Sequence, residues 1–341
     1  MSQTLLRLAG ALLLGAAAMG ASVQSGAQSS AQNSAQNSTQ TPAFPARPMR
    51  LVVPFAAGGP IDVLARAVGA RLAATTGQAV LVDNKPGAGS IIAWDHVAKS
   101  VPDGHTLLVS GVGTRTILPA IASQVPFDAA KDLVAITPLS EASVIFVAHP
   151  GTGFKTLADL VAKAKAQPDK VSIANPAPGT VTHFAASLLQ RDAAIRLTEI
   201  PYKGGAPATL AVVGGEVDLM TADIGAVLAQ IQGGRVLPLA VGSAKRLAVL
   251  PNVPTATEAG YPNLVAVNVY GLFGPAGLPK DLVKRINALM VEALRAPDVQ
   301  AQLAKIGLQP TSSSAEAFEA YLREQTDKWA PVAKASGVRF N

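Results

Sequence analysis

Residues 49–72 read MRLVVPFAAGGPIDVLARAVGARL, and the fold prediction starts from this stretch. Residues 49–55 form an apolar run of the kind found in short buried strands. Two glycines and a proline at 58–60 end the run, since these residues favour turns. From Ile61 to Leu72 the apolar residues recur at helical spacing. The stretch therefore predicts a strand, a glycine turn and a helix in succession.

The same alternation continues along the chain. Further strands are predicted at 80–82, 106–110, 144–148, 171–174, 197–201, 217–221, 236–241 and 268–274. Further helices are predicted at 91–98, 157–166, 182–190, 208–213, 224–232, 280–295, 298–306 and 315–333. Strands that alternate with helices predict an α/β fold of mostly parallel sheets flanked by helices.

The length and the order of these elements predict two lobes. A chain of 341 residues exceeds the usual size of one domain. The last three predicted helices have no strands of their own, so we expect them to return to the first α/β unit. Lobe 1 then comprises 45–145 and 266–341, and lobe 2 comprises 146–265. A discontinuous lobe leaves two connecting segments and a hinge, as in a clamshell that closes on a ligand.

The N-terminus predicts a cleavable export signal. Residues 1–27 combine a weakly basic start at Arg7, a short apolar run over 5–19 and small residues before a cleavage point at Ala27. A membrane anchor is the alternative, but the run is too short to span a bilayer. Residues 28–44 are polar and of low complexity, so we expect a disordered linker. We expect the mature protein to be soluble and periplasmic.

Composition restricts the classes of function. The chain has no Cys, which excludes disulfides, thiolate metal sites and cysteine nucleophiles. Its four His lack metal-ligand spacing and no phosphate-loop motif is present, so we expect no metal and no cofactor. The net charge of +6 raises the question of nucleic acid, but basic residues are scattered and aromatic residues make up only 4%. A mildly basic protein suits a small anionic ligand instead.

The turn at 55–62 is the first candidate ligand site. It leads into the start of a helix, where unpaired N–H groups and the helix dipole favour an anion. Glycine lets a ligand approach the backbone, so a carboxylate or phosphate can bind there without Lys or Arg. The alternative is an ordinary tight turn in which Asp62 only caps the helix. The candidate residues are Phe55, Ala56, Ala57, Gly58, Gly59 and Asp62.

Two more glycine loops are expected at the same sheet edge, where open α/β sheets bind ligands. Residues 86–90 read PGAGS, which resembles half of a dinucleotide-binding fingerprint with Ile92 in place of the third glycine. We therefore expect backbone donors for the same ligand rather than a dinucleotide. The loop at 110–114 follows the third predicted strand. The candidates in both loops are Ala88, Gly89, Ser90, Ser110 and Gly113.

The second predicted lobe supplies further candidates. Thr180 and Thr182 can cap a helix or bind a ligand through their hydroxyls. His183 has no Cys, no Ser-x-Gly elbow and no carboxylate nearby in sequence, so a structural histidine is favoured over a catalytic base. Lys203 is either a cation that closes on an anion or a solvated loop lysine. The candidates are Thr180, Thr182, His183, Tyr202, Lys203, Gly204 and Asp223.

With these loops the sequence resembles the Bug, or TctC-like, family, the substrate-binding receptors of tripartite tricarboxylate transporters. Each glycine loop alone is a weak signal, but the shared stretches run in order through the whole mature chain. Besides 49–72 they are VDNKPGAGS (82–90), AKSVPDGHTLLVS (98–110), PFDAAKDLVAITPL (126–139), PGTVTHFAASLL (178–189), IPYKGGAPATLAVVGGEVDLM (200–220), LPNVPTATEAGYP (250–262) and YGLFGPAGLP (270–279).

The resemblance implies a two-lobed periplasmic-binding-protein fold, of type II or Venus flytrap form, with a small carboxylate in the cleft. It implies that the loops at 55–62 and 88–90 hold one ligand carboxylate through backbone N–H groups. The stretches 175–178 and 268–269 depart from the commoner family pattern, and such changes reshape the distal pocket. We expect a monomeric receptor without enzymatic activity that serves tripartite-transporter membrane subunits. A partner of a membrane sensor, or an α/β transferase that uses Lys203 or His183, are the alternatives.

Overall fold

The computed structural model describes residues 44–122, 124–176, 179–336 and 338–339. The predicted export signal and all of the predicted linker except Phe44 lie outside these residues. In the described part, the predicted alternation of strands and helices is confirmed.

The elements are as follows. The strands are β1 (Met49–Val53), β2 (Val80–Asn84), β3 (Thr106–Gly111), β4 (Leu133–Ala148), β5 (Ser172–Asn175), β6 (Thr198–Pro201), β7 (Leu219–Asp223), β8 (Leu237–Val241), β9 (Val267–Pro275) and β10 (Gln309–Pro310). The helices are α1 (Pro60–Thr76), α2 (Ile91–Ala98), α3 (Gly113–Thr116), α4 (Leu118–Ile121), α5 (Leu157–Ala166), α6 (Val181–Ala193), α7 (Gly205–Gly214), α8 (Ile224–Gln232), α9 (Lys280–Arg295), α10 (Pro297–Lys305) and α11 (Ala315–Ala335). Short 3-10 turns are η1 (Ala88–Ser90) and η2 (Pro150–Thr152).

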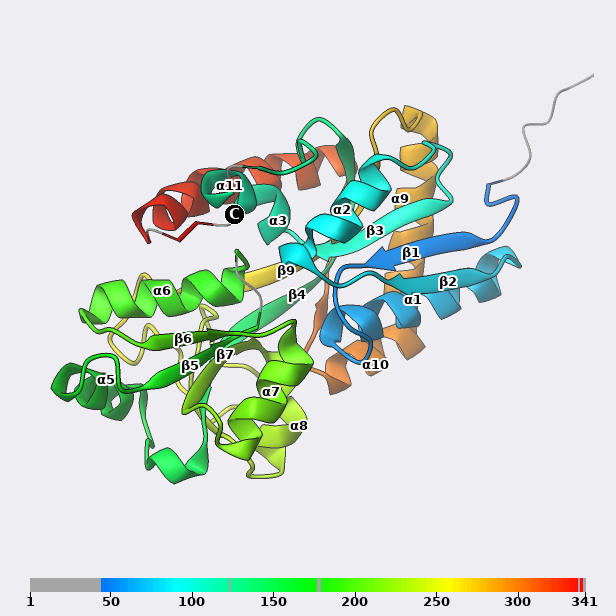
Figure 1. The fold of residues 1–341 in the computed structure, drawn as a ribbon. Coiled ribbons are helices and arrows are strands. Elements are labelled where there is room, and N and C mark those ends of the chain that lie inside the picture. The colour runs from blue at the N-terminus through cyan, green and yellow to red at the C-terminus, as the bar shows by residue number, and fades with distance from the viewer. Residues whose placement is uncertain (1–43, 123, 177–178, 337, 340–341) are drawn as a thin grey trace, which may run out of the picture. The chain divides into compact units, whose positions relative to one another are not determined.

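A mixed sheet of ten strands runs through the described residues (Figure 1). Its order is β2-β1-β3-β9-β4-β7-β5-β6, and β8 and β10 also pair with β4. Residues 133–143 of β4 pair with β9 and β10, and residues 144–148 pair with β7 and β8. We call 133–143 with β1, β2, β3, β9 and β10 the first sheet region, and 144–148 with β5 to β8 the second. One continuous strand, β4, therefore belongs to both regions.

The expected α/β fold is confirmed, but the sheet is mixed where mostly parallel sheets were expected. The outer strands pair in parallel, whereas β4 and β9 run antiparallel to all their neighbours. The sequence predicted β4 only at 144–148, because Pro138, Ser140 and Glu141 make the preceding residues resemble a loop. Register shifts against β9, between Ala135 and Thr137 and between Pro138 and Ser140, accommodate this segment in the sheet.

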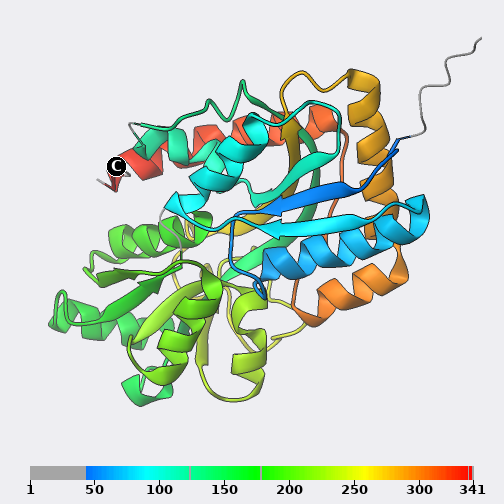
Figure 2. The same cartoon turned by 45° about the vertical axis from the view of Figure 1, so that its right-hand side comes forward.

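Helices cover both faces of the first sheet region. Side chains alternate across a strand, so neighbouring residues of β1 face opposite ways. Leu51 packs in the cluster formed with α1, α9 and α10, and Val52 packs in the cluster formed with Trp94 of α2 and Phe318 of α11. Figures 1 and 2 show α1 and α10 on one face of these strands and α2 on the other. The buried alternation fixes the register of β1 in the sheet.

The second sheet region is covered in the same way. Phe146 of β4 packs in a cluster with α5 and α6, whereas its neighbours Ile145 and Val147 pack with α7 and α8. All three side chains are fully buried. Strands β5, β6 and β7 run parallel to one another, so the helices that follow them begin at one common edge of this region. That edge faces the first region.

The C-terminal helix α11 contacts both regions. Phe318, near its start, is buried in the first region. Trp329, near its end, shares a hydrophobic cluster with Phe184 of α6 and with α4. Pro331 lies inside the helix, two residues beyond Trp329. The tail was expected to return to lobe 1, and the packing adds a contact with the second region. The lobe boundaries themselves stay a prediction.

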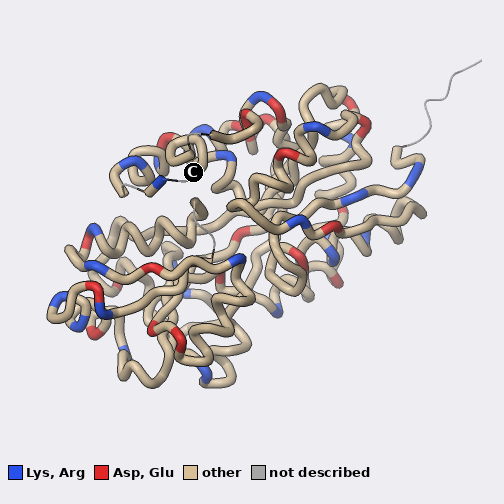
Figure 3. Tube along the Cα trace, viewed as in Figure 1, with Lys and Arg blue, Asp and Glu red and all other residues tan. Residues whose placement is uncertain are grey.

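The charged side chains are mixed on the surface. Lys and Arg lie along outer helices and loops of both regions, with Asp and Glu among them (Figure 3). Many are paired, as in the contacts between Arg246 and Glu258 and between Arg196 and Asp169. Among the helices of the described residues, none has the length and apolar character needed to cross a membrane.

We predict that Trp329→Ala lowers the free energy of unfolding by about 3–5 kcal/mol, because it removes a large, fully buried side chain and leaves a cavity between α11 and α6. Urea unfolding followed by circular dichroism measures this change. The matched control is Asp327→Ala, on the exposed side of the same helix turn. Equal stability of the two variants would contradict the packing role of Trp329.

Candidate functional site

A cavity lies where the two sheet regions meet. Its walls come from the loops after β1, β3, β5, β6 and β7 and from β9 itself. The centre of a water molecule can occupy about 70 Å³ of it, several times the ~10–15 Å³ that one water requires. The described lining residues are Phe55, Ala56, Gly59, Pro60, Ile61, Ser110, Gly111, Gly113, Thr114, Pro176, Thr180, Val181, Thr182, Gly204, Gly205, Ala206, Pro207, Met220, Ala222, Asp223, Ala226, Asn268 and Tyr270.

The helices α1, α6, α7 and α8 all begin at this cavity. The first N–H groups of a helix have no acceptor within the helix and carry a partial positive charge. Gly59 and Gly204 are the N-caps of α1 and α7, and neither start has a side-chain cap. No capping side chain therefore takes up these N–H groups, and an anion in the cavity can accept from them.

Asp223 is the one charged side chain in the described lining. Its Oδ2 accepts hydrogen bonds from the hydroxyl of Tyr270 and, at 3.2 Å, from the amide of Asn268. Its Oδ1 is shielded from solvent and has no hydrogen-bond partner among the described residues. Burial raises the pKa of Asp223 to about 6, although the bonds from Tyr270 and Asn268 act in the opposite direction. The charge of the cavity therefore changes close to neutral pH.

The turn before α1 is held by Asp62, which is almost fully buried. Its Oδ2 accepts from the Gly58 N–H at 3.0 Å and from Arg66 at 2.9 Å, and its Oδ1 accepts from Asn84 at 2.9 Å. Asn84 also donates to the carbonyl of Phe55 at 3.0 Å. Burial raises the pKa of Asp62, but the bonds from Arg66, Gly58 and Asn84 outweigh it and hold the pKa below its usual value. Asp62 therefore positions the turn from outside the cavity.

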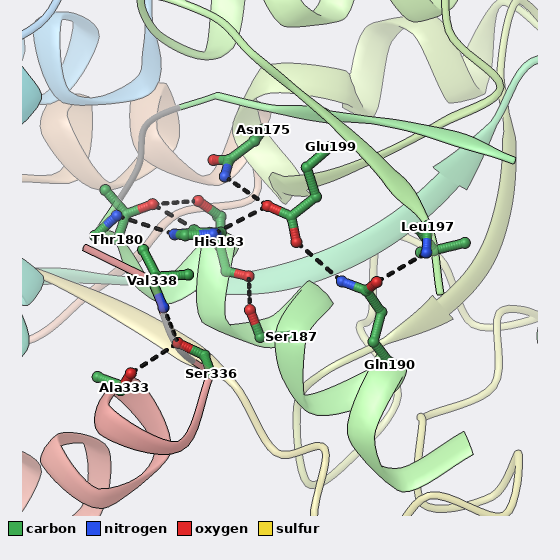
Figure 4. Close-up of polar contacts among 12 residues, drawn as sticks. Asn175, Thr180, His183, Ser187, Gln190, Leu197, Glu199, Ala333, Ser336 and Val338 are labelled. Atoms are coloured by element: carbon green, nitrogen blue, oxygen red, sulfur yellow. Dashed lines mark hydrogen bonds and ion pairs between the residues drawn. The ribbon is translucent and has the colours of Figure 1, made fainter. Parts of the chain in front are cut away.

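His183 joins the loop before α6 to β6 (Figure 4). Its Nδ1 accepts from the Gly179 N–H at 3.0 Å, and its Nε2 lies 3.0 Å from Glu199. A neutral ring that accepts at Nδ1 carries its proton at Nε2, so Nε2 donates to Glu199. Glu199 also accepts from Gln190 and Asn175. Burial raises the pKa of Glu199, but the contact with His183, together with the bonds from Gln190 and Asn175, outweighs burial and lowers it. Both ring nitrogens of His183 are engaged, so the geometry favours the structural histidine.

The predicted candidates divide into two sets. Those that line the cavity are Phe55, Ala56, Gly59, Ser110, Gly113, Thr180, Thr182, Gly204 and Asp223. Those outside the lining are Ala57, Gly58, Asp62, Ala88, Gly89, Ser90, His183, Tyr202 and Lys203. Tyr202 packs against the core of the second region, and Lys203 is exposed.

Residues 88–90 form η1, beside α2 and outside the cavity wall. Ala88 and Ser90 have φ values of 46° and 83°, in the left-handed region that residues with a Cβ seldom adopt. The following helix reaches the cavity indirectly, since Trp94 donates to the Oγ of Ser110 at 3.0 Å. The helix after the predicted segment therefore supports one lining residue, and residues 88–90 themselves lie outside the lining.

Sequence reasoning missed several lining residues. They are Pro60, Ile61, Gly111, Thr114, Pro176, Val181, Gly205, Ala206, Pro207, Met220, Ala222, Ala226, Asn268 and Tyr270. Most of them lie in the same loop as a predicted candidate. Their position directly after a strand is the sequence signal that could have identified them. Asn268 and Tyr270 lie inside β9. In the sequence, only the departure of residues 268–269 from the commoner family pattern marked that stretch.

Comparison with known proteins gives a consistent family. The family description that matches residues 64–338 is "Tripartite tricarboxylate transporter family receptor" (TctC). The chain is similar to a UPF0065 protein of the tcbD-tcbE intergenic region of a Pseudomonas species, with 35% identity over 84% of this chain and 85% of that protein. It is also similar to BugT of Bordetella pertussis, with 32% identity over 87% of this chain and 91% of BugT.

Solved structures agree with these sequences. The periplasmic binding protein BugD has a TM-score of 0.82 and 32% identity, over 87% of this chain and 99% of BugD. Rpa4515 of R. palustris with adipate has a TM-score of 0.84 and 28% identity, over 87% of this chain and 99% of that one. MatC of Rhodopseudomonas palustris with bound malate has a TM-score of 0.81 and 32% identity, over 85% of this chain and 100% of MatC.

We predict that Asp62→Asn lowers the free energy of unfolding by about 1–2 kcal/mol at pH 7, because the bonds to Arg66 and to the Gly58 N–H weaken when the charge is lost. The pKa of Asp62 is lowered by folding, so its contribution is complete above the unfolded pKa of about 4 and is lost as the pH falls through the folded pKa.

Urea unfolding of wild type and variant between pH 7 and pH 3 measures this difference, which we expect to shrink toward pH 3. Asp95→Asn is the control, because Asp95 forms the same type of ion pair, with Lys99, four residues along α2; its effect should stay under about 0.5 kcal/mol. A difference between wild type and Asp62→Asn that does not change with pH would contradict the assigned role of the carboxylate.

Proposed function

This chain belongs to the tripartite tricarboxylate transporter receptor family, and from that membership we propose that it captures one small carboxylate between its two lobes. The family consists of solute-binding receptors, and its member BugD is a periplasmic binding protein. In the proposed function, the cavity between the sheet regions is the ligand site.

The observation that carries the proposal is the make-up of the cavity wall. The starts of α1, α6, α7 and α8 meet there, beside the start of the short helix α3, and the described lining contains no Lys and no Arg. Backbone N–H donors and helix dipoles bind a small anion, such as a carboxylate or a phosphate, without a cation. A Cβ built at Gly59 would meet only one atom within 4 Å, the carbonyl oxygen of Ala56 at 3.7 Å. This leaves room for a ligand beside the start of α1. The malate and adipate in the structures of MatC and Rpa4515 support the same ligand class.

We propose that the ligand is released unchanged, so that the chain acts as a receptor and not as a transferase. The two residues considered for catalysis support this: His183 has both ring nitrogens engaged, and Lys203 lies outside the lining. Ser110, which does line the cavity, accepts from Trp94 and contacts the carbonyl of Gly111 through its hydroxyl.

We propose that residues 1–27 direct export and are then removed, so that the receptor works in the periplasm. The weakly basic start, the apolar run and the small residues of this segment support the proposal. The proposed partners are the membrane subunits of a tripartite tricarboxylate transporter, to which a monomeric receptor presents the closed, loaded form.

Close packing between the regions supports a closed arrangement in this structure. A Cβ built at Gly225, at the start of α8, would lie 2.8 Å from the carbonyl oxygen of Ile306 and 3.3 Å from Pro60. Gly113 also faces the opposite region, less tightly, since its Cβ would lie 3.4 Å from the Gly179 carbonyl oxygen. Glycine at 225 therefore lets the start of α8 approach the backbone of the first region.

The direct test is isothermal titration calorimetry of the folded protein with propionate, malate, succinate, adipate and citrate and with carboxylates that bear an amino group. We predict that at least one carboxylate binds with one molecule per chain and is recovered unchanged after incubation. Folding is checked by circular dichroism. The absence of binding by every carboxylate, or conversion of the bound one, would refute the proposed function.

We also predict that Gly225→Ala weakens carboxylate binding by about tenfold or more, because the added methyl group forces α8 away from Ile306 and disfavours closure. Gly225 does not line the cavity, so the added methyl group does not itself occupy the ligand site. Titration calorimetry gives the affinity, and small-angle X-ray scattering reports the separation of the lobes. Gly214→Ala is the control, because its Cβ would meet nothing within 4 Å. Wild-type affinity in Gly225→Ala would exclude closure at this contact.

A further inference from the structure

Asp223 gives the cavity a preference beyond the binding of a carboxylate. A carboxylate in the lining is unexpected where the ligand itself is an anion, and no cation of the described lining neutralises it. An ionised Asp223 and a ligand with two carboxylates would place like charges in one small space, which is unfavourable. The position of Asp223 therefore restricts which chemical groups of the ligand can lie beside β7 and β9.

The contacts of Asp223 fix its orientation and leave one oxygen without a donor. Tyr270 and Asn268, both on β9, donate to Oδ2. Oδ1 is buried and has no partner among the described residues. A buried carboxylate oxygen without a donor is unfavourable, so the binding of a ligand group that donates to Oδ1 stabilises the closed form.

We propose, on the basis of the function proposed above, that the ligand is a zwitterion: a small carboxylate with a protonated amino group, whose ammonium Asp223 accepts through Oδ1. The starts of the helices then bind the carboxylate end, and Asp223 binds the ammonium end. An ammonium group supplies both a hydrogen-bond donor and the opposite charge, whereas a hydroxyl group supplies only the donor. Tyr270 and Asn268 are positioning residues in this arrangement.

The competing arrangement is a protonated Asp223 that donates to a second carboxylate of the ligand. It predicts the opposite pH dependence. Binding of an ammonium group requires the ionised form of Asp223 and strengthens as the pH rises through about 6, whereas binding of a second carboxylate requires the protonated form and weakens over the same range.

Few other groups titrate near Asp223. β7 and α8 carry no other titratable residue, and neither do β5, β8 and α7. From β9, Tyr270 has a pKa raised well above its usual value, so it stays neutral. On β4, Glu141 is exposed on the first sheet region. From the start of α1, Asp62 has a lowered pKa and stays ionised above pH 5.

The experiment uses matched pairs of probes that differ by one amino group: L-alanine and propionate, L-aspartate and succinate, L-glutamate and glutarate. Titration calorimetry at pH 7.5 compares the two members of each pair. We expect the amino member of at least one pair to bind about tenfold or more tightly than its partner, and its affinity to fall about tenfold between pH 7 and pH 5 as Asp223 takes up a proton.

The variant Asp223→Asn keeps the size of the side chain and removes its charge. We expect it to weaken binding of the preferred amino acid by about tenfold or more and to abolish the pH dependence, while binding of the matched deaminated acid stays equal or improves. Glu216→Gln is the control, since Glu216 is an exposed acid in the same sheet region. Thermal unfolding establishes that each variant is folded; if Asp223→Asn does not fold, the pH profile of wild type decides.

The outcomes separate this inference from the proposed function. A deaminated acid that binds as tightly as its amino partner, or more tightly, with an affinity that falls as the pH rises, overturns the inference and leaves the carboxylate receptor in place. Binding of no probe from either half of the pairs, and of no carboxylate in the wider panel, overturns both. Loss of amino-acid binding in Asp223→Asn but not in Glu216→Gln supports the inference.

Discussion

Backbone N–H groups at the starts of α1, α6, α7 and α8 are the constraint to which the rest of the described chain is adapted. They lie at one place because each helix follows a strand whose C-terminal end points to the gap between the sheet regions. Thr180 accepts from one of them, the His183 N–H of α6. The starts of α1, α7 and α8 have no side-chain cap, so their donors need another acceptor when water is excluded. The wall of the cavity is thus made mainly of backbone and small residues, and side chains such as Asp62 and His183 act from behind it by fixing the loops.

The path of β4 and β9 makes this meeting of helix starts possible. Strand β4 passes from one sheet region to the other, and β9 pairs beside it up to Ser143 and Val267. The residue before β9, Ala266, bonds to Val144 and Gly242, so a second segment of chain crosses beside β4. Two neighbouring strands at a crossing restrict motion to bending and twisting about that point. Asn268 and Tyr270 lie next to the crossing and hold Asp223, so the chemistry of the cavity is connected directly to the segment that bends.

Much of this arrangement was predictable from local patterns. The helix predicted at 280–295 coincides with α9, and the glycine turn at 55–62 leads into α1, as predicted. The turn contributes to the cavity wall, and its role in ligand binding stays a prediction. Long-range pairing was not predictable: the first part of β4 contains Pro138 and is a strand only because β9 pairs with it. The partner of His183 is Glu199, on strand β6, and no spacing in the sequence connects them. The two residues that orient Asp223 are likewise distant from it in the chain.

The position of Trp329 has a consequence for how long a bound ligand stays. This side chain and the end of α11 pack near α6, whose start lines the cavity. In the proposed receptor, opening of the cavity at α6 therefore also separates α6 from α11. Release then requires exposure of apolar surface that never touches the ligand. Pro331 lies in the same helix and removes one of its backbone hydrogen bonds, which makes this end easier to bend. Substitutions near the C-terminus are therefore a route by which dissociation rates can change while the contacts to the ligand stay the same.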